Sequence, residues 1–215
     1  MGLLALIVIA GAAGGCTRGQ RHFNEGQSEM KKGRYAEAVA AFERAVAENA
    51  EFGEAHYNLG AARFELAGAR LRAVISKRGP EALRKALPPP GLAPNAPRPA
   101  VDVAALRRDL ATLPAAETGP VLRLIRDSVT AKNRALHLFR AGKFLVVKEP
   151  AEQRRMLSQL ESAVTLWEVV IRESTRDRTQ ALLAILWPQV LRDLLLWPAP
   201  GKNGADGPGA PNGQP

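Results

Sequence analysis

The sequence predicts an all-α protein, and three features support this fold class. Gly and Pro are concentrated around residues 88–99 and 198–215, which leaves long runs without either residue. Those runs are rich in Ala, Leu, Arg and Glu, residues with high helix propensity. No segment shows the apolar–polar alternation of a half-buried strand. With 215 residues, of which 46% are hydrophobic and 24% charged, the chain is expected to form one helical domain with tails.

A repeated spacing organises the N-terminal part of the chain. Gly26 and Gly60 lie 60 − 26 = 34 residues apart, and His22 and His56 have the same separation. Glycine at such points allows two helices to approach closely, since a larger side chain would push them apart. Gly33 lies between them and is expected to end a helix, because it adopts a backbone conformation that costs other residues more.

These residues resemble the tetratricopeptide (TPR) repeat, a helix pair with a period of 34 residues. Residues 57–60 (YNLG) match the middle of its first helix, and residues 33–35 (GRY) match its turn. Ala38, Phe42 and Ala45 match the small, aromatic and small positions of its second helix. The resemblance covers roughly residues 20–68 and implies TPR-like repeats within residues 16–87. An ordinary helical hairpin with glycines at this spacing by chance is the alternative.

The expected elements follow in chain order. The first repeat consists of helices from Arg18 to Lys32 and from Tyr35 to Asn49. The second opens at Gly53, and its first helix either turns at Gly68 or continues to Lys77. Gly79-Pro80 breaks that helix, and residues 81–87 are expected to end the missing second helix of this repeat.

The C-terminal half is expected to pack on the repeats. Residues 88–100 form a Pro-rich linker or loop, and further helices are expected at about 101–112, 119–141, 150–173 and 176–197. Ala135, Gly142 and Phe144 repeat the spacing of Gly26, Gly33 and Tyr35, which is compatible with a third, degenerate repeat. The apolar last helix is expected to be buried, or alternatively to contact a partner or membrane surface through Trp187 and Trp197. Residues 198–215 are expected to be disordered.

The N-terminus predicts export and lipidation. The apolar run of residues 3–13 is too short to span a bilayer, and it fits the core of a signal peptide over residues 1–15. Residues 13–16 (AGGC) resemble the bacterial lipobox, which implies lipidation of Cys16, the only cysteine. Ala13 stands where Leu is usual, and no Lys or Arg precedes the apolar run. Thr17 in place of Asp favours the outer membrane, facing the periplasm. An uncleaved apolar tail with an incidental cysteine is the alternative.

The sequence does not indicate catalysis. It contains no GxSxG, HExxH, P-loop or GxGxxG string, and its three histidines include the repeat-related His22 and His56. A metal site at that pair would need further ligands, so helix packing is the preferred interpretation. We therefore expect no metal, no cofactor, no small-molecule substrate and no nucleic acid.

The TPR resemblance implies a protein partner. First helices of TPR repeats line a concave groove, and the matching positions here are Phe23, Gln27, Met30, Lys31, Tyr57, Ala61, Phe64 and Glu65. These side chains are expected to form an exposed or half-exposed apolar face. Alternatively, the N-terminal segment or the later helices cover them. The groove that clamps a chaperone's C-terminal carboxylate uses Lys and Asn at positions occupied here by other residues, so that ligand is not indicated.

The net charge of +9 is unevenly distributed. Residues 70–148 contain sixteen Lys and Arg against five Asp and Glu. The preferred function is a non-catalytic envelope lipoprotein that acts as a protein-interaction scaffold or assembly factor. The alternative is a binder of anionic envelope polymers or lipid headgroups through residues 70–148. High arginine usage that serves only solubility would explain the same composition.

Overall fold

The protein folds into helices that pack as antiparallel pairs, which confirms the all-α prediction. The computed structural model describes residues 19–87, 102–144 and 149–186. Cys16, the Pro-rich segment, Trp187, Trp197 and the tail lie outside these residues. The helices of the described part are α1 (Gln20–Lys31), α2 (Tyr35–Glu48), α3 (Gly53–Arg78), α4 (Glu81–Ala86), α5 (Val103–Ala111), α6 (Ala115–Arg140), α7 (Pro150–Ser174) and α8 (Arg178–Leu186).

Helices α1 and α2 form the first repeat as predicted. Gly33 ends the turn between them with φ 72°. Its N–H donates to Met30 O at 3.0 Å, and the Arg34 N–H donates to Glu29 O at 2.9 Å, the hydrogen bonds of a Schellman motif. At the crossing of the two helices, a Cβ on Gly26 would lie 2.7 Å from the Phe42 ring. The predicted close approach at Gly26 is therefore confirmed.

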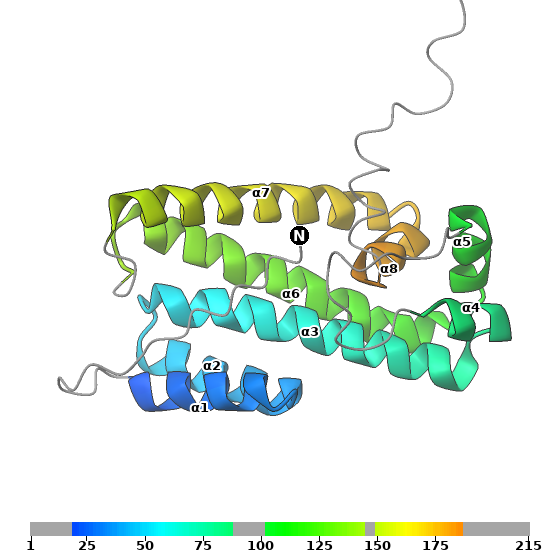
Figure 1. The fold of residues 1–215 in the computed structure, drawn as a ribbon, viewed down its shortest axis with the longest axis horizontal. Coiled ribbons are helices and arrows are strands. Elements are labelled where there is room, and N and C mark those ends of the chain that lie inside the picture. The colour runs from blue at the N-terminus through cyan, green and yellow to red at the C-terminus, as the bar shows by residue number, and fades with distance from the viewer. Residues whose placement is uncertain (1–18, 88–101, 145–148, 187–215) are drawn as a thin grey trace, which may run out of the picture.

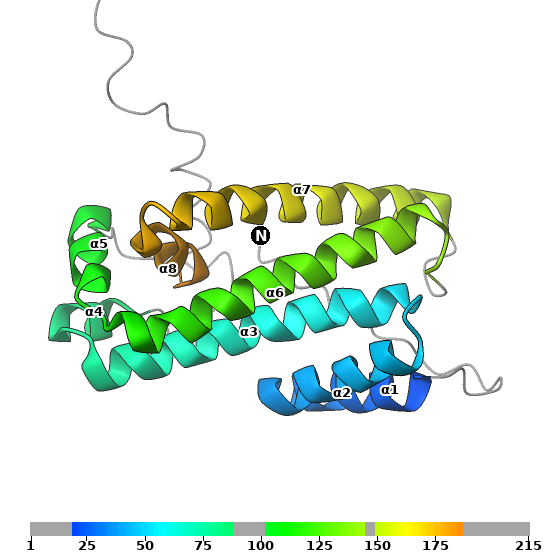
Figure 2. The same ribbon diagram turned by 180° about the vertical axis from the view of Figure 1, so that it is seen from behind.

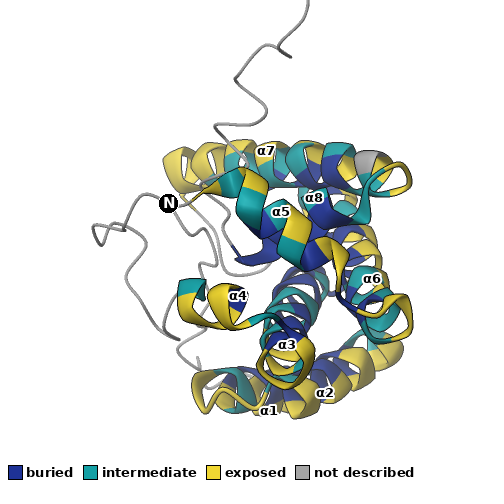
Figure 3. Cartoon of the chain, turned by 90° about the vertical axis from the view of Figure 1, so that its right-hand side faces the viewer, coloured by how far each residue is buried: buried dark blue, intermediate teal, exposed yellow. Residues whose placement is uncertain are grey.

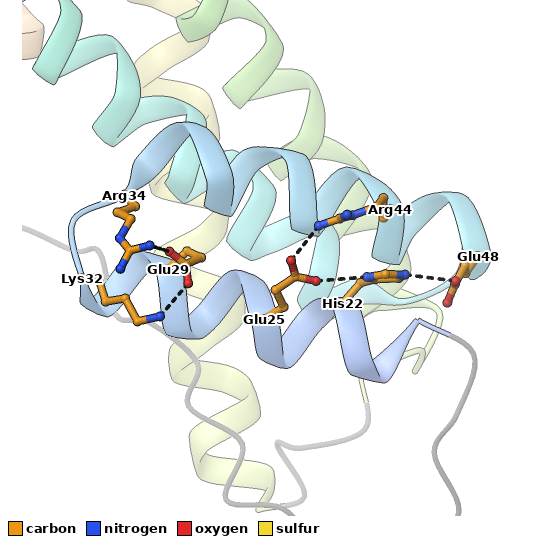
Figure 4. Close-up of polar contacts among 7 residues, drawn as sticks. All are labelled: His22, Glu25, Glu29, Lys32, Arg34, Arg44 and Glu48. Atoms are coloured by element: carbon orange, nitrogen blue, oxygen red, sulfur yellow. Dashed lines mark hydrogen bonds and ion pairs between the residues drawn. The ribbon is translucent and has the colours of Figure 1, made fainter.

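Charged side chains hold the register of this helix pair on its outer surface (Figure 4). His22 lies between two carboxylates, 3.2 Å from Glu25 through Nδ1 and 3.3 Å from Glu48 of α2 through Nε2. Arg44 of α2 contacts Glu25 at 2.8 Å. The hydrogen bond with His22, aided by Arg44, lowers the pKa of Glu25. Such exposed pairs contribute little stability individually, so apolar packing is the main stabilising term.

Helix α3 continues without interruption to Arg78, so the open question of a turn at Gly68 is resolved in favour of a single long helix. The chain breaks at Gly79-Pro80 as predicted. The expectation that residues 81–87 end the second helix of repeat two is wrong. They form the six-residue helix α4, and the helix that packs antiparallel along α3 is α6 (Figures 1 and 2).

Helix α6 occupies the place that α2 has in the first repeat. A Cβ on Gly60 would lie 2.7 Å from Cγ of Lys132 and 2.9 Å from O of Ser128. The Ser128 hydroxyl donates to Gly60 O at 2.6 Å. In α2 the three TPR positions, Ala38, Phe42 and Ala45, are spaced four and three residues apart. Ser128, Lys132 and Ala135 of α6 have the same spacing. Repeat two is therefore split in sequence, with α4 and α5 inserted between its two helices.

The turn after α6 has the same positive-φ glycine and the same backbone hydrogen bonds as the turn after α1. Gly142 has φ 68°, and its N–H donates to Phe139 O at 2.9 Å. The Lys143 N–H donates to Leu138 O at 2.8 Å. Phe144 differs from Tyr35, because it precedes α7 and places its ring against Gly53 at the start of α3. The predicted third repeat therefore agrees with the structure at the Gly142 turn, whereas Phe144 does not occupy the position that Tyr35 has in the first repeat.

A second apolar core forms where α3 and α6 extend beyond the first repeat. Helix α8 lies within it, and its residues 181–186 are all buried (Figure 3). Arg107 of α5 contacts Asp177 before α8, and Arg178 donates to the carbonyls of Ala111 and Leu113 at 2.9 and 2.8 Å. The predicted burial of the last helix is confirmed for these residues. Among the described helices, none is both long and apolar enough to cross a membrane.

Replacing Gly60 with Ala should destabilise the fold by roughly 1–3 kcal/mol, because the new methyl group overlaps α6. Gly68 is the matched control, since its nearest neighbour for a Cβ is Cγ2 of Ile185 at 3.9 Å. Gly68→Ala should stabilise α3 by up to about 1 kcal/mol through helix propensity. Urea unfolding of both variants tests this contrast. Equal changes in the two variants would contradict a close α3–α6 contact at Gly60.

Candidate functional site

The predicted apolar groove is not vacant, so that expectation is wrong. Phe23 is fully buried, and its ring centroid lies 5.7 Å from that of Phe42 and 4.8 Å from that of Phe52. Ala61 is also buried. Tyr57 packs against α6 and α7, in a cluster with Ala135, Leu136, Leu160 and Val164. The alternative that later helices cover these positions is correct for Tyr57.

Phe64 is half-buried at the junction of α3, α6 and α7. Its ring meets that of Trp167 edge to face, with centroids 4.8 Å apart. The ammonium of Lys132 lies 5.7 Å from the Phe64 ring centroid, within the range of a cation–π interaction. Phe64 is therefore a packing residue that links three helices. Of the remaining predicted groove residues, Met30 is half-buried against the first core and Lys31 is exposed.

Lys132 is a buried cation inside the α3–α6 interface, where the first repeat has Phe42. Its side chain is 6% exposed, and burial lowers its pKa from 10.5 to about 8, partly opposed by the negative charge of Glu65. Burial likewise raises the pKa of Glu65, opposed by Arg72 and Lys132. The two charges lie near enough for each to shift the pKa of the other.

Two of the predicted groove residues, Ala61 and Glu65, lie on a further face of α3. Ala55, Leu59 and Ala62 face α2, while Gly60 and Tyr57 face α6. Helical spacing puts a third stripe between these two. It is polar, and its members are Glu54, Asn58, Ala61 and Glu65. Gln27 of α1 is also buried. We call these five residues the polar stripe; three of them (Gln27, Ala61 and Glu65) were predicted groove positions.

Asn58 is the unusual member of the polar stripe. It is 0% exposed, and neither its amide nitrogen nor its amide oxygen has a hydrogen-bond partner. A buried amide without partners loses its hydration without compensation, at a cost of about 1–3 kcal/mol. Buried polar groups of this kind call for an explanation, and a ligand is one. The sequence analysis missed Asn58, although its four-residue spacing from Glu54 could have indicated a polar face.

The two repeat-related histidines do not form a site. His22 bridges two glutamates on the surface, and His56 contacts the Ala50 carbonyl through Nε2 at 3.1 Å. In the described ranges, no group of three or more His, Cys, Asp or Glu side chains is arranged to hold a metal ion. Their equal positions in the two repeats therefore reflect helix packing and surface pairing.

Comparison with known proteins agrees with the helix geometry. Residues 26–66 match the family model described as TPR repeat. The chain contains a TPR repeat. No curated protein and no solved structure gives a significant match. TPR proteins are generally non-catalytic scaffolds, so the repeat indicates a role in protein–protein interaction. The match ends near the middle of α3, where the long extensions of α3 and α6 begin.

Replacing Lys132 with Met should stabilise the protein at pH 7. The folded-state pKa lies about 2.5 units below the unfolded value, so the charged form is disfavoured by roughly 3 kcal/mol. This cost is fully present below pH 8 and disappears as pH rises through 10.5. The gain of Lys132→Met in chemical unfolding should shrink over that range. Lys143→Met, at an exposed ion pair with Glu51, is the control and should change stability by less than about 0.5 kcal/mol. A destabilised Lys132→Met variant would contradict this reading.

Proposed function

We propose that this protein is a non-catalytic scaffold that binds a segment of a partner protein along the polar stripe. The observation that carries the proposal is the buried, unpartnered amide of Asn58 within a TPR repeat. An asparagine amide offers a donor and an acceptor together, which matches the N–H and C=O of one extended peptide unit. Ala61, one turn further along, is also buried, so a peptide reaches the stripe only when the helices that cover it move apart.

The chemistry of the stripe favours a polar partner segment. Its acidic members, Glu54 and Glu65, flank Asn58 on the same stripe of α3. The aromatic side chains that would anchor an apolar ligand are packed inside the protein instead. Main-chain hydrogen bonds at Asn58, with carboxylates on either side, therefore suit an extended segment that carries donors or positive charge.

We place this scaffold at the bacterial cell envelope, anchored by lipid through Cys16 and facing the periplasm from the outer membrane. The support is the apolar run and the AGGC ending of residues 1–16, which lie outside the described residues. Stable attachment requires more than one acyl chain, as a lipoprotein provides. The partners would then be proteins of the envelope.

Several of the cations in residues 70–148 are paired with carboxylates or buried. Arg78, Lys85, Arg107, Arg140 and Lys143 each form an ion pair, and Lys132 is buried. These contacts reduce the support for a general binder of anionic polymers or lipid headgroups.

Asn58→Leu tests the proposed groove, because leucine has the same branched arrangement of heavy atoms without the amide. Stability should stay equal or rise by up to about 1 kcal/mol, since no internal hydrogen bond is lost. Envelope proteins recovered on the tagged protein from solubilised membranes should include a set that this variant loses. Asn24→Leu on the outer face of α1, where Asn24 accepts from Gln20, is the matched control and should retain that set. If Asn58→Leu unfolds the protein and recovery follows only the folded fraction, Asn58 is structural.

The lipid anchor has its own test. Mass spectrometry of the mature N-terminus should find acylated Cys16, and Cys16→Ser should move the protein into the soluble fraction. Intact Met1 in protein purified from the envelope would rule out the anchor and leave the groove proposal standing.

A further inference from the structure

The face of α3 that α2 covers continues beyond the start of α2. Helices α1 and α2 lie beside only the N-terminal half of α3 (Figures 1 and 2). Burial raises the pKa of Tyr35, the first residue of α2, and the nearby charges of Glu65 and Arg72 also shift it, which places that end of α2 midway along α3. Beyond this point, the same side of α3 exposes small and basic residues, namely Ala69, Arg70, Ala73, Ser76 and Lys77.

Helix α6, which packs along α3, also carries exposed basic residues. Arg123, Arg126 and Arg134 are exposed and lie on one stripe of α6, at spacings of three and eight residues. We call the five exposed α3 residues together with Arg123 and Arg126 the basic face. Its four cations have no ion pair within the described ranges 19–87, 102–144 and 149–186. The Asp127 carboxylate is the nearby acid on α6, and it is exposed.

Arg63 contacts α6 on the side of α3 that carries Arg70 and Lys77. Arg63 donates to the Asp127 carbonyl of α6 at 3.1 Å. Burial lowers the pKa of His56, and the charges of Arg134 and Arg63 lower it further. Both arginines are therefore close to His56, although they come from different helices.

The packing of α2 provides an internal example of what this stripe binds. Glu43 of α2 pairs with Arg63 of α3 at 2.9 Å. Arg70 and Lys77 follow Arg63 at successive seven-residue steps, so they lie on the same stripe of α3. A helix placed on α3 beyond α2 would bring acidic side chains opposite Arg70 and Lys77 in the way that Glu43 meets Arg63.

We propose that the basic face docks an acidic amphipathic helix of a partner protein. Ala69 and Ala73 allow a helix backbone to approach closely, and Arg70, Lys77, Arg123 and Arg126 select for carboxylates. The exposed stretch from Ala69 to Arg78 is about 15 Å long at 1.5 Å per residue, which suits a helix of about three turns.

An anionic membrane fits this surface less well. A planar bilayer against the basic face would also approach α2, whose exposed Glu37 and half-exposed Glu43 carry negative charge beside it. The narrow strip of cations next to an acidic helix matches a rod-shaped partner. The basic face and the polar stripe occupy different lengths of α3, since the polar stripe ends at Glu65 and the basic face begins at Ala69; Arg70 and Lys77 lie on the stripe of Arg63 and not on that of Asn58. A variant of one surface therefore leaves the other testable.

A displayed library of helix-forming 14-residue peptides, selected on the full chain, tests the proposal. The wild type should enrich peptides with acidic residues at helical spacing and an alanine-rich or apolar seam. Arg70→Glu with Lys77→Glu should reduce binding of the enriched peptides at least tenfold. The control is Arg84→Glu with Arg108→Glu, which changes the net charge equally at exposed sites on α4 and α5, and it should alter binding less than threefold.

A variant without charge change separates helix docking from general attraction of polyanions. Ala73→Trp should weaken binding of the enriched peptides at least fivefold, because the indole ring prevents a partner helix from approaching α3. Absence of acidic enrichment, or equal binding by both charge-reversal pairs, would overturn the proposal. Normal binding of the enriched peptides by Ala73→Trp would also overturn it. So would tight binding of the wild type to vesicles of phosphatidylglycerol and phosphatidylcholine, if Arg70→Glu with Lys77→Glu abolished that binding.

Discussion

The close contact of α3 with α6 at Gly60 is the constraint on which the architecture depends. The Ser128 hydroxyl donates to the Gly60 carbonyl, and the Lys132 side chain lies against the glycine where any Cβ would collide. Small residues at a helix crossing permit this approach. The insert containing α4 and α5 is then displaced to the far end of the two long helices (Figure 1).

The same contact determines which faces of α3 are covered. Packing of α6 and α7 takes the aromatic residues Tyr57 and Phe64 into the interior. The polar stripe with its unpartnered Asn58 lies on one side of this interface. On the other side, the part of α3 beyond α2 exposes Arg70 and Lys77. One long helix thus carries two chemically distinct regions, a buried polar stripe and an exposed stretch rich in cations.

Local pattern predicted much of this fold because short-range rules govern it. The helix positions, the turn at Gly33 and the crossing at Gly26 follow from period and glycine chemistry. The pairing of α3 with α6 could not be predicted in the same way, since it joins segments on either side of a long insert. The groove residues were predicted from their positions in the repeat. Repeat position does not predict exposure here, because α6 and α7 cover Tyr57. Asn58 escaped notice because its missing partner is visible only in three dimensions.

Nuclear Overhauser effects from the Gly60 α protons test the central claim most directly, namely that α6 completes the second repeat. The packing predicts cross-peaks from Gly60 to the side chain of Lys132 and to the α and β protons of Ser128, because these groups are in contact. It also predicts cross-peaks between Tyr57 and Leu136. Cross-peaks from Gly60 to residues of α4, with none to α6, would contradict the account.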